Sequence, residues 1–141
     1  MFGYSPAIEQ PDHWDLPLRG RQVTMLRIDY SFGIVLWAND AEVSIRIEAP
    51  FTLEAAGASH TIDPINDRDS LCYTLGLFGK SVSEGRAYKT GVLELKFTDG
   101  TSIRVDSGSK FEPWEVSGSH GLLVVSLPDH RLAVWQPKLP T

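Results

Sequence analysis

The sequence has a single cysteine, two methionines and no apolar run long enough to cross a membrane. Cys72 cannot form an internal disulfide, because it has no second cysteine to pair with. The longest apolar runs, GLLVVSL and FGIVLWA, fall far short of the roughly 20 residues that a membrane-spanning helix needs. The N-terminus lacks a basic start followed by an apolar run. We therefore expect no secretory signal, no membrane segment and a cytoplasmic location.

Basic residues are also scarce relative to acidic ones. The 13 Lys and Arg residues face 18 Asp and Glu residues, which gives a formal net charge of −5. Because grip on a phosphate backbone comes mostly from Lys and Arg, this balance disfavours nucleic acid as a partner and favours a basic protein. The length of 141 residues fits one ordinary domain, and the hydrophobic fraction of 42% is enough for one core.

The texture of the chain changes at Gly20. Before it, three prolines and scattered apolar residues predict an irregular arm; after it, short segments rich in Val, Ile, Thr, Phe and Trp predict strands. The predicted organisation is an irregular N-terminal arm (1–19), a single β domain (20–135) and a loose tail (136–141). Within the domain we predict repeat one (20–54), a connector with a helix (55–78), repeat two (79–116) and a final hairpin (121–135).

The stretch GVLELKFTDGTSIRV predicts a β-hairpin, because apolar and polar residues alternate on both sides of Asp-Gly. A two-residue turn would mix the two faces, since Leu95 would lie opposite Arg104. A three-residue loop, Thr98 to Gly100, with Gly100 in the left-handed conformation, instead pairs Leu95 with Ile103 and keeps the apolar residues on one side. We expect this second register.

An earlier stretch, YSFGIVLWANDAEVSIRI, aligns without a gap with YKTGVLELKFTDGTSIRV, and GRQVT aligns with GKSVS upstream. Each copy is interpreted as a strand leading into a hairpin, and we predict an internal duplication. The turn of the first copy stays open. A loop at Asp40 to Glu42 pairs Trp37 with Ile45, whereas a tighter loop at Asn39 and Asp40 pairs Leu36 with Val43, and both keep the faces consistent.

Between the two copies, Leu71, Leu75 and Phe78 follow α-helical spacing. We expect one short helix there, with Cys72 packed on its apolar side as an inert thiol. A small sheet is marginal in water unless its apolar face is covered. The predicted fold class is therefore mainly β: two pseudo-repeated antiparallel units that form a sandwich or a partly open barrel, with one short connecting helix. Unprotected edge strands make a homodimer an expected assembly.

The two G-[RK]-x-V-[TS] segments, FTDGTSIRV, FEPWEV and PDHRLAVW together resemble a bacterial domain family of unknown function, found mainly in actinobacteria as small stand-alone proteins. The resemblance covers roughly Leu18 to Gln136. The sequence departs from the family at DAE, where the first hairpin often has a turn with glycine, so the geometry of that turn is left open. The family has no established activity, and the resemblance implies no catalytic residue.

Two polar segments are candidates for binding. The connector holds His60, Asp63, Asp67 and Asp69, and the segment FEPWEV holds Glu112, Trp114 and Glu115. Carboxylates beside an aromatic residue suit a cationic partner. The structural alternatives are that Asp63 starts a turn, that Asp67 or Asp69 caps the helix, and that Trp114 is a core residue.

No pattern for a catalytic residue, a metal site or a cofactor emerges. The chain lacks an EF-hand loop, a G-x-S-x-G elbow and a glycine-rich phosphate loop, and the pairs of Asp and His in PDHWD and PDHR are interpreted as ordinary turn residues. We expect an uncharacterised, noncatalytic cytoplasmic binding or interaction protein with an immunity-like role against a basic protein. The alternative is a small enzyme or ligand-binding β barrel with a pocket between the two repeats.

Overall fold

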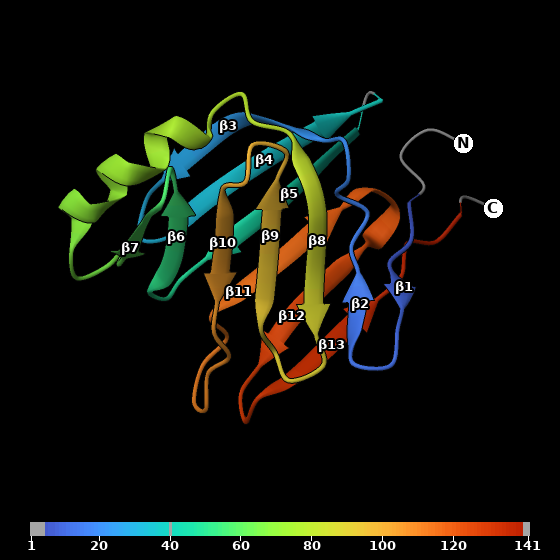
Figure 1. Cartoon of the computed structure of the whole chain (residues 1–141). Helices are drawn as coiled ribbons and strands as arrows, with labels where there is room; N and C mark the ends of the chain where they lie inside the picture. Colours follow the sequence, from blue (N-terminus) through green and yellow to red (C-terminus); the bar gives the residue numbers. More distant parts are fainter. Residues whose placement is uncertain (1–4, 40, 140–141) are drawn as a thin grey trace.

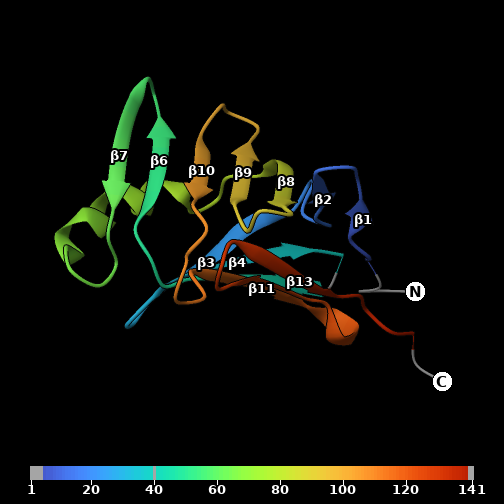
Figure 2. The ribbon, with the colours of Figure 1, turned by 90° about the horizontal axis from the view of Figure 1, so that it is seen from below.

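Two antiparallel β-sheets pack face to face in the computed structural model, which describes residues 5–39 and 41–139 (Figures 1 and 2). Sheet A has seven strands in the order β1-β2-β8-β9-β10-β6-β7, and sheet B has six in the order β13-β12-β11-β5-β4-β3. Figure 2 shows the two sheets as separate layers. The predicted class, a mainly β protein with two antiparallel units, is confirmed as a sandwich and not a closed barrel.

The strands of sheet A are β1 (Ile8–Glu9), β2 (His13–Asp15), β8 (Val82–Tyr88), β9 (Leu93–Phe97), β10 (Ser102–Val105), β6 (Phe51–Ala55) and β7 (Ala58–Ile62). The strands of sheet B are β13 (Arg131–Trp135), β12 (Leu123–Leu127), β11 (Trp114–Gly118), β5 (Ala41–Ile47), β4 (Phe32–Ala38) and β3 (Gln22–Ile28). The two helices of the described residues are both of the 3-10 type, η1 (Arg68–Leu77) and η2 (Ser119–Gly121).

The N-terminal arm is more regular than expected. It contains the short strands β1 and β2, and β2 extends sheet A by pairing with β8, with His13 opposite Tyr88. The three prolines bound these strands but do not prevent them, because each strand is only two or three residues long. The first segment of the arm, residues 1–4, lies outside the described residues.

The predicted register of the β9–β10 hairpin is confirmed. Leu95 lies opposite Ile103, and the loop spans Thr98 to Gly100, between the paired residues Phe97 and Thr101. Gly100 has a φ of +91°, a value that suits glycine because it has no Cβ to clash. The alternation of apolar and polar residues thus predicts the loop length correctly, whereas the Asp-Gly pair alone would predict a two-residue turn.

The β4–β5 hairpin takes the tighter of the two registers left open by the sequence. Leu36 lies opposite Val43 and Ala38 opposite Ala41, so the loop consists of Asn39 and Asp40. Asn39 has a φ of 51°, a left-handed value that asparagine tolerates well. Asp40 lies outside the described residues.

This shorter loop corrects the gapless alignment of the two copies. Ile45 and Ile103 occupy equivalent places, yet Ile45 pairs with Ile34 whereas Ile103 pairs with Leu95. The alignment had matched Ile34 with Val92 instead. It therefore holds for β5 and β10 but is out of register for β4 and β9.

The two meanders, β3-β4-β5 and β8-β9-β10, exchange the strands that follow them. After β5 the chain crosses to sheet A, where β6 pairs with β10; after β10 it crosses to sheet B, where β11 pairs with β5. Each crossing ends in a proline followed by a buried aromatic residue, Phe51 or Trp114. The exchange fastens the two sheets to one another.

The segments that lead into β3 and β8 also pair with each other. Four backbone hydrogen bonds of 2.8–2.9 Å join them: Gly20 N to Val82 O, Gly79 N to Val23 O, Val82 N to Arg21 O, and Val23 N to Lys80 O. When each residue is replaced by its equivalent in the other copy, the first bond becomes the second, and the third becomes the fourth. Each strand has a register shift directly afterwards, between Val23 and Met25 and between Val82 and Glu84. The pairing supports an internal duplication, which stays a prediction.

The space between the sheets is filled by apolar side chains. The largest fully buried ones include Trp114, Phe32, Ile34, Leu53 and Leu95. Phe32 of sheet B stacks on Phe51 of sheet A with ring centroids 5.6 Å apart. These contacts argue against the expected alternative of a ligand pocket between the two repeats, because core side chains occupy that place.

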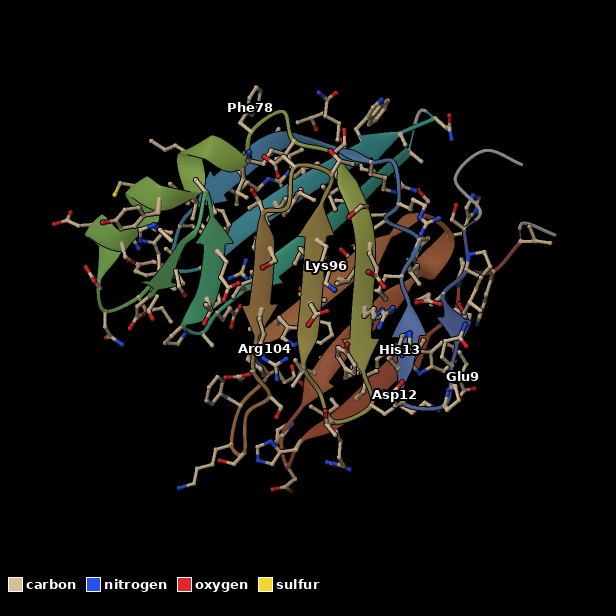
Figure 3. All side chains as sticks on the ribbon, in the orientation of Figure 1. Glu9, Asp12, His13, Phe78, Lys96 and Arg104 are labelled. Atoms are coloured by element: carbon tan, nitrogen blue, oxygen red, sulfur yellow. The ribbon has the colours of Figure 1, made fainter. Side chains whose placement is uncertain are left out.

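The connecting helix differs from the expectation in type and in its buried face. The buried residues of η1 are Ser70, Leu71, Thr74 and Leu77, and the last three recur every third position, as in a 3-10 helix with three residues per turn. The expected face had α-helical spacing, and two of its members, Leu75 and Phe78, are exposed (Figure 3 labels Phe78). Cys72 is also exposed, which corrects its predicted packing role.

The connector contains a strand that was not predicted. β7 (Ala58–Ile62) pairs with β6 through a turn at Ala56 and Gly57, whose φ values are 52° and 78°. Alanine is an uncommon residue for a left-handed turn position, so the sequence AAGA carried little hairpin signal.

Candidate functional site

The carboxylates of the connector are used within a turn. Asp63 Oδ1 accepts hydrogen bonds from the backbone N–H groups of Ile65 and Asn66, at 3.1 and 3.0 Å. The bond from Asn66 is the main reason why the pKa of Asp63 lies below its usual value. Asp63 therefore starts the turn, as the structural alternative proposed.

The other candidate residues of the connector have different surroundings. Asp67 precedes η1 without a side-chain capping bond, and Asp69 lies exposed in the first turn. His60, on β7, stacks on Tyr73 of η1 with ring centroids 3.8 Å apart. The structure thus gives His60 a packing contact between β7 and η1, and it does not gather the four connector residues into one site.

Trp114 belongs to the core. Its side chain is 1% exposed, and its indole Nε1 donates a 2.9 Å hydrogen bond to the carbonyl of Gly91. This contact corrects the binding interpretation for Trp114, because a buried indole cannot present its face to a partner.

Glu112 and Glu115, the neighbours of Trp114, lie on the outer face of sheet B. Together with Arg46 and Glu48 they line a small groove beside the chain that enters β11. Glu115 lies directly opposite Arg46 in the β5–β11 ladder. Arg46 Nε donates to Glu48 Oε1 at 2.5 Å, and this bond is the main cause of the raised pKa of Arg46. Of the seven residues predicted to bind, Glu112, Trp114 and Glu115 line this groove, although Trp114 is otherwise buried.

A larger groove adjoins this one over the middle of sheet B. It has a volume of about 250 Å³ and shares Arg46 and Glu115 with its neighbour. The floor is formed by small residues of three adjacent strands: Gly33 of β4, Ser44 of β5 and Ser117 of β11. We call this space the sheet B groove, lined chiefly by Arg27, Gly33, Ser44, Arg46, Glu115 and Ser117.

Several polar groups of the sheet B groove lack a partner among residues 5–39 and 41–139. The guanidinium of Arg27 donates only to the sulfur of Met25, at 3.4 Å, and makes no ion pair with a described carboxylate. Within the same residues, the hydroxyls of Ser44 and Ser117 make no hydrogen bond, and Glu115 acts on Arg46 through its charge without a close ion pair. These groups are the kind that orients a bound molecule in a concave site.

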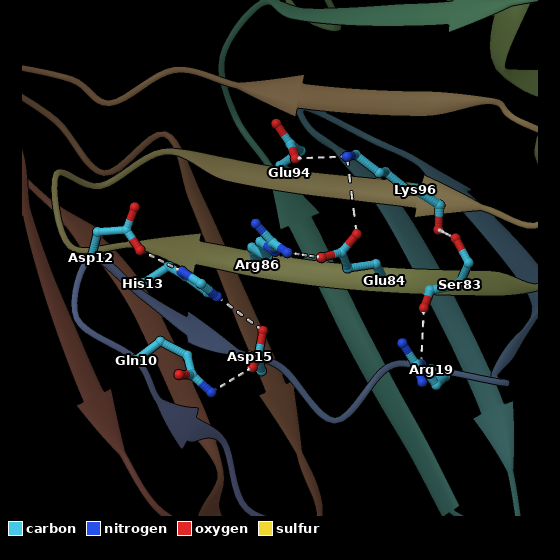
Figure 4. Close-up of polar contacts among 10 residues, drawn as sticks. All are labelled: Gln10, Asp12, His13, Asp15, Arg19, Ser83, Glu84, Arg86, Glu94 and Lys96. Atoms are coloured by element: carbon cyan, nitrogen blue, oxygen red, sulfur yellow. Dashed lines mark hydrogen bonds and ion pairs between the residues drawn. The ribbon is translucent and has the colours of Figure 1, made fainter.

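The outer face of sheet A is, in contrast, covered by ion pairs of its own. Lys96 lies between Glu84 and Glu94, at 4.0 and 3.7 Å, and Arg86 pairs with Glu84 (Figure 4). Arg104 lies 3.9 Å from Glu94 on the other side. Such pairs are typical of a solvated sheet surface, and we assign this face no binding role.

The histidine of PDHWD is held between two carboxylates. His13 Nδ1 lies 2.6 Å from Asp12 Oδ1, and Nε2 lies 3.0 Å from Asp15 Oδ1 (Figures 3 and 4). The contact with His13 lowers the pKa of Asp12. Within the described part of the chain, no group of three or more His, Cys, Asp or Glu side chains is arranged to hold a metal ion.

The histidine of PDHR fastens two loops. His130 Nδ1 lies 2.5 Å from Ser107 Oγ, and the backbone N–H groups of Asp129 and His130 donate to the carbonyls of Ser109 and Gly108. The contact with Ser107 was not predicted, because the two residues lie on different loops. A serine beside a histidine is a nucleophile and base pair only with an orienting group and a substrate site. Here the surrounding bonds indicate that the pair holds the loop after β10 against the β12–β13 turn.

Most of the chain matches one protein family. The model of DUF6188, a family of unknown function, matches residues 14–136. The chain belongs to this family. The match to DUF6188 includes both meanders, both crossing strands and every residue of the sheet B groove. No curated protein and no solved structure matched the chain. In the described residues, no helix has the length and apolar character to span a membrane.

Proposed function

We propose that the protein is a noncatalytic binding protein that engages a protein partner through the outer face of sheet B. The observation that carries this proposal is the sheet B groove, where Arg27 has no carboxylate partner and the hydroxyls of Ser44 and Ser117 make no hydrogen bond within the described residues. On the outer face of sheet A, by comparison, Glu94 pairs with Lys96 and Arg104. Groups left unpaired over a floor of small side chains are available to a partner.

The charge of the chain fits this role. Glu112 and Glu115 add two carboxylates at one end of the face, and the net charge of −5 would steer a basic protein toward it. An immunity-like protein of a bacterial cytoplasm, bound to a basic toxin, is the form of partnership that we propose from the sequence. The groove then supplies specific contacts after the encounter.

The test compares equivalent positions on the two outer faces. Ser44 and Ser102 occupy the same place in β5 and β10, so Ser44→Arg fills the sheet B groove while Ser102→Arg makes the same change on sheet A. The wild type and both variants are used as bait in lysate of the source organism, with quantitative mass spectrometry. A candidate partner is then purified, and its affinity is measured by calorimetry.

We expect one partner that wild type and Ser102→Arg retain and Ser44→Arg loses, with at least about a ten-fold weaker Kd for the purified pair. Circular dichroism melting checks that both variants are folded. Equal binding by Ser44→Arg and wild type would remove the sheet B groove from the interface, and turnover of a substrate by purified protein would replace this proposal with an enzyme.

A further inference from the structure

The outer faces of the two sheets carry the same row of residues with one difference at its centre. In sheet A the row is Arg86, Glu94 and Arg104, each directly opposite the next across β8, β9 and β10. In sheet B the equivalent row across β3, β4 and β5 is Arg27, Gly33 and Arg46. A glycine therefore stands in sheet B where a glutamate stands between two arginines in sheet A.

In sheet A the carboxylate at the centre of the row, Glu94, lies near two cationic side chains. Glu94 Oε2 lies 3.9 Å from Arg104 Nη1, and Glu94 Oε1 lies 3.7 Å from Lys96 Nζ (Figure 4 draws the Glu94–Lys96 contact). In sheet B the space over Gly33 is the sheet B groove, and Arg27 beside it has no carboxylate partner among the described residues. The position that an internal carboxylate fills on one face is open on the other.

We propose that the sheet B groove binds a carboxylate, from an aspartate or glutamate side chain of the protein partner, over Gly33 and between Arg27 and Arg46. The inference rests on the proposed function, which makes this face the recognition surface. The guanidinium of Arg27 offers a planar fork that matches a carboxylate. The unpaired hydroxyls of Ser44 and Ser117 add two donors on the floor.

The remaining charges of the groove limit which anion fits. Arg46 is already held by Glu48 and lies 3.8 Å from Asp29, so it contributes its positive field more than free donors. Asp29 and Glu115 line the same groove and repel additional negative charge. The charges of Arg27 and Arg46 are matched by those of Asp29 and Glu115, so one bound carboxylate adds a single negative charge beside Arg27, whereas a phosphate group adds nearly two. The geometry thus selects an acidic side chain over a phosphate ester.

The first test measures anion binding by the whole chain directly. Isotope-labelled protein is titrated with the blocked tripeptide acetyl-Gly-Glu-Gly-amide, with its Gln analogue, and with inorganic phosphate, while the amide signals of Gly33 and Ser44 and the Arg27 Nε signal are followed. We expect the Glu peptide to shift these signals at millimolar concentration and to bind at least about ten times more tightly than the other two probes.

Matched arginine variants locate the site. Arg27→Gln is expected to weaken binding of the Glu peptide about ten-fold, and Arg104→Gln, on the equivalent row of sheet A, is expected to leave it unchanged. Equal affinity for the Glu and Gln peptides, stronger binding of phosphate, or an equal loss in both arginine variants would overturn the proposal.

The second test builds the missing carboxylate into the chain. Gly33→Glu gives sheet B the same Arg-Glu-Arg row that sheet A has, and Gly33→Gln is the uncharged control. A Cβ at position 33 would lie 3.1 Å from Arg27 Cβ, but both variants share this contact, so their difference reports the charge alone. We expect Gly33→Glu to melt higher than Gly33→Gln at low salt, the gap to close near about 1 M NaCl, and Gly33→Glu to lose the Glu peptide.

A melting temperature of Gly33→Glu at or below that of Gly33→Gln would contradict an anion site at this position. The two proposals fail separately. If Ser44→Arg abolishes binding of a protein partner but neither peptide nor Gly33→Glu reveals a preference for negative charge, the binding face stands and the carboxylate inference falls. If the Glu peptide binds but every partner tolerates Ser44→Arg, the anion site stands without the proposed partnership.

Discussion

Asp99 is held in the loop of the β9–β10 hairpin by two neighbours. Its Oδ2 accepts a hydrogen bond from Lys80 Nζ, and its Oδ1 accepts one from the backbone N–H of Thr101 at 3.0 Å. These contacts, with Lys80 first, lower the pKa of Asp99 from 3.8 to about 2. Because the folded state favours the charged form, the stabilisation is complete above the unfolded pKa and is lost as the pH falls toward 2.

We therefore predict that Asp99→Asn lowers the free energy of unfolding at pH 7 by less than about 1 kcal/mol, because the ion pair is exposed to solvent. The deficit relative to wild type should shrink between pH 4 and pH 2, as measured by urea titration at several pH values. Asp69→Asn, at an exposed residue that makes no ion pair within the described residues, is the control and should change little at either pH. A deficit for Asp99→Asn that is equal at pH 7 and pH 2 would contradict the assignment.

Gly85 leaves room for a residue of the N-terminal arm. A Cβ at this position would lie 2.6 Å from Leu18 Cδ1 and 3.2 Å from Leu18 Cγ, and Leu18 is fully buried. Gly85→Ala should therefore destabilise the protein by about 1–3 kcal/mol through overpacking. Gly76→Ala, where a Cβ meets open space within η1, is the matched control and should be neutral or slightly stabilising. Chemical denaturation checks both; an equal effect would mean that Leu18 moves aside freely.

At the scale of elements, local alternation predicts registers only where one choice mixes the faces. It fixes the β9–β10 hairpin, because the wrong loop would bury Arg104, but both loops of the β4–β5 hairpin keep Leu36 and Ile45 inside. The buried face of η1 was missed for a related reason. Three-residue and four-residue spacings both leave Leu71 inside, and η1 lies against β7, a strand that was not predicted.

The confirmed register of the β9–β10 hairpin carries its own prediction. Leu95 is fully buried opposite Ile103, whereas Lys96 is half exposed on the outer face. Leu95→Ala should lower the free energy of unfolding by about 2–5 kcal/mol, and Lys96→Ala by under about 0.5 kcal/mol. A denaturant titration measures both, and comparable losses would show that the side chains do not face opposite sides in solution.

At the scale of the whole molecule, the sequence alone could not predict the candidate site, because the site depends on which strands become neighbours. Glu115 was identified as a candidate from its segment, but Arg27 and Gly33 reach it only through the order β3-β4-β5-β11. The crossing of β11 to sheet B is a long-range choice that alternation does not specify. Repeated sequence indicated two similar units, but not that they exchange strands.

The exchange of strands predicts that neither half of the chain is complete. In a fragment of residues 1–66, the β6–β7 hairpin lacks β10, and β5 lacks β11; in a fragment of residues 67–141, β10 and β11 lack the same contacts. Each fragment would expose a sheet edge and the apolar face of the core, so each should lack a cooperative unfolding transition alone. Mixed in equal amounts, the fragments should regain the dispersed NMR spectrum and the cooperative melting of the intact chain, at a temperature that rises with concentration. A fragment that melts cooperatively by itself would mean that the stability of each meander does not depend on the strands it receives from the other.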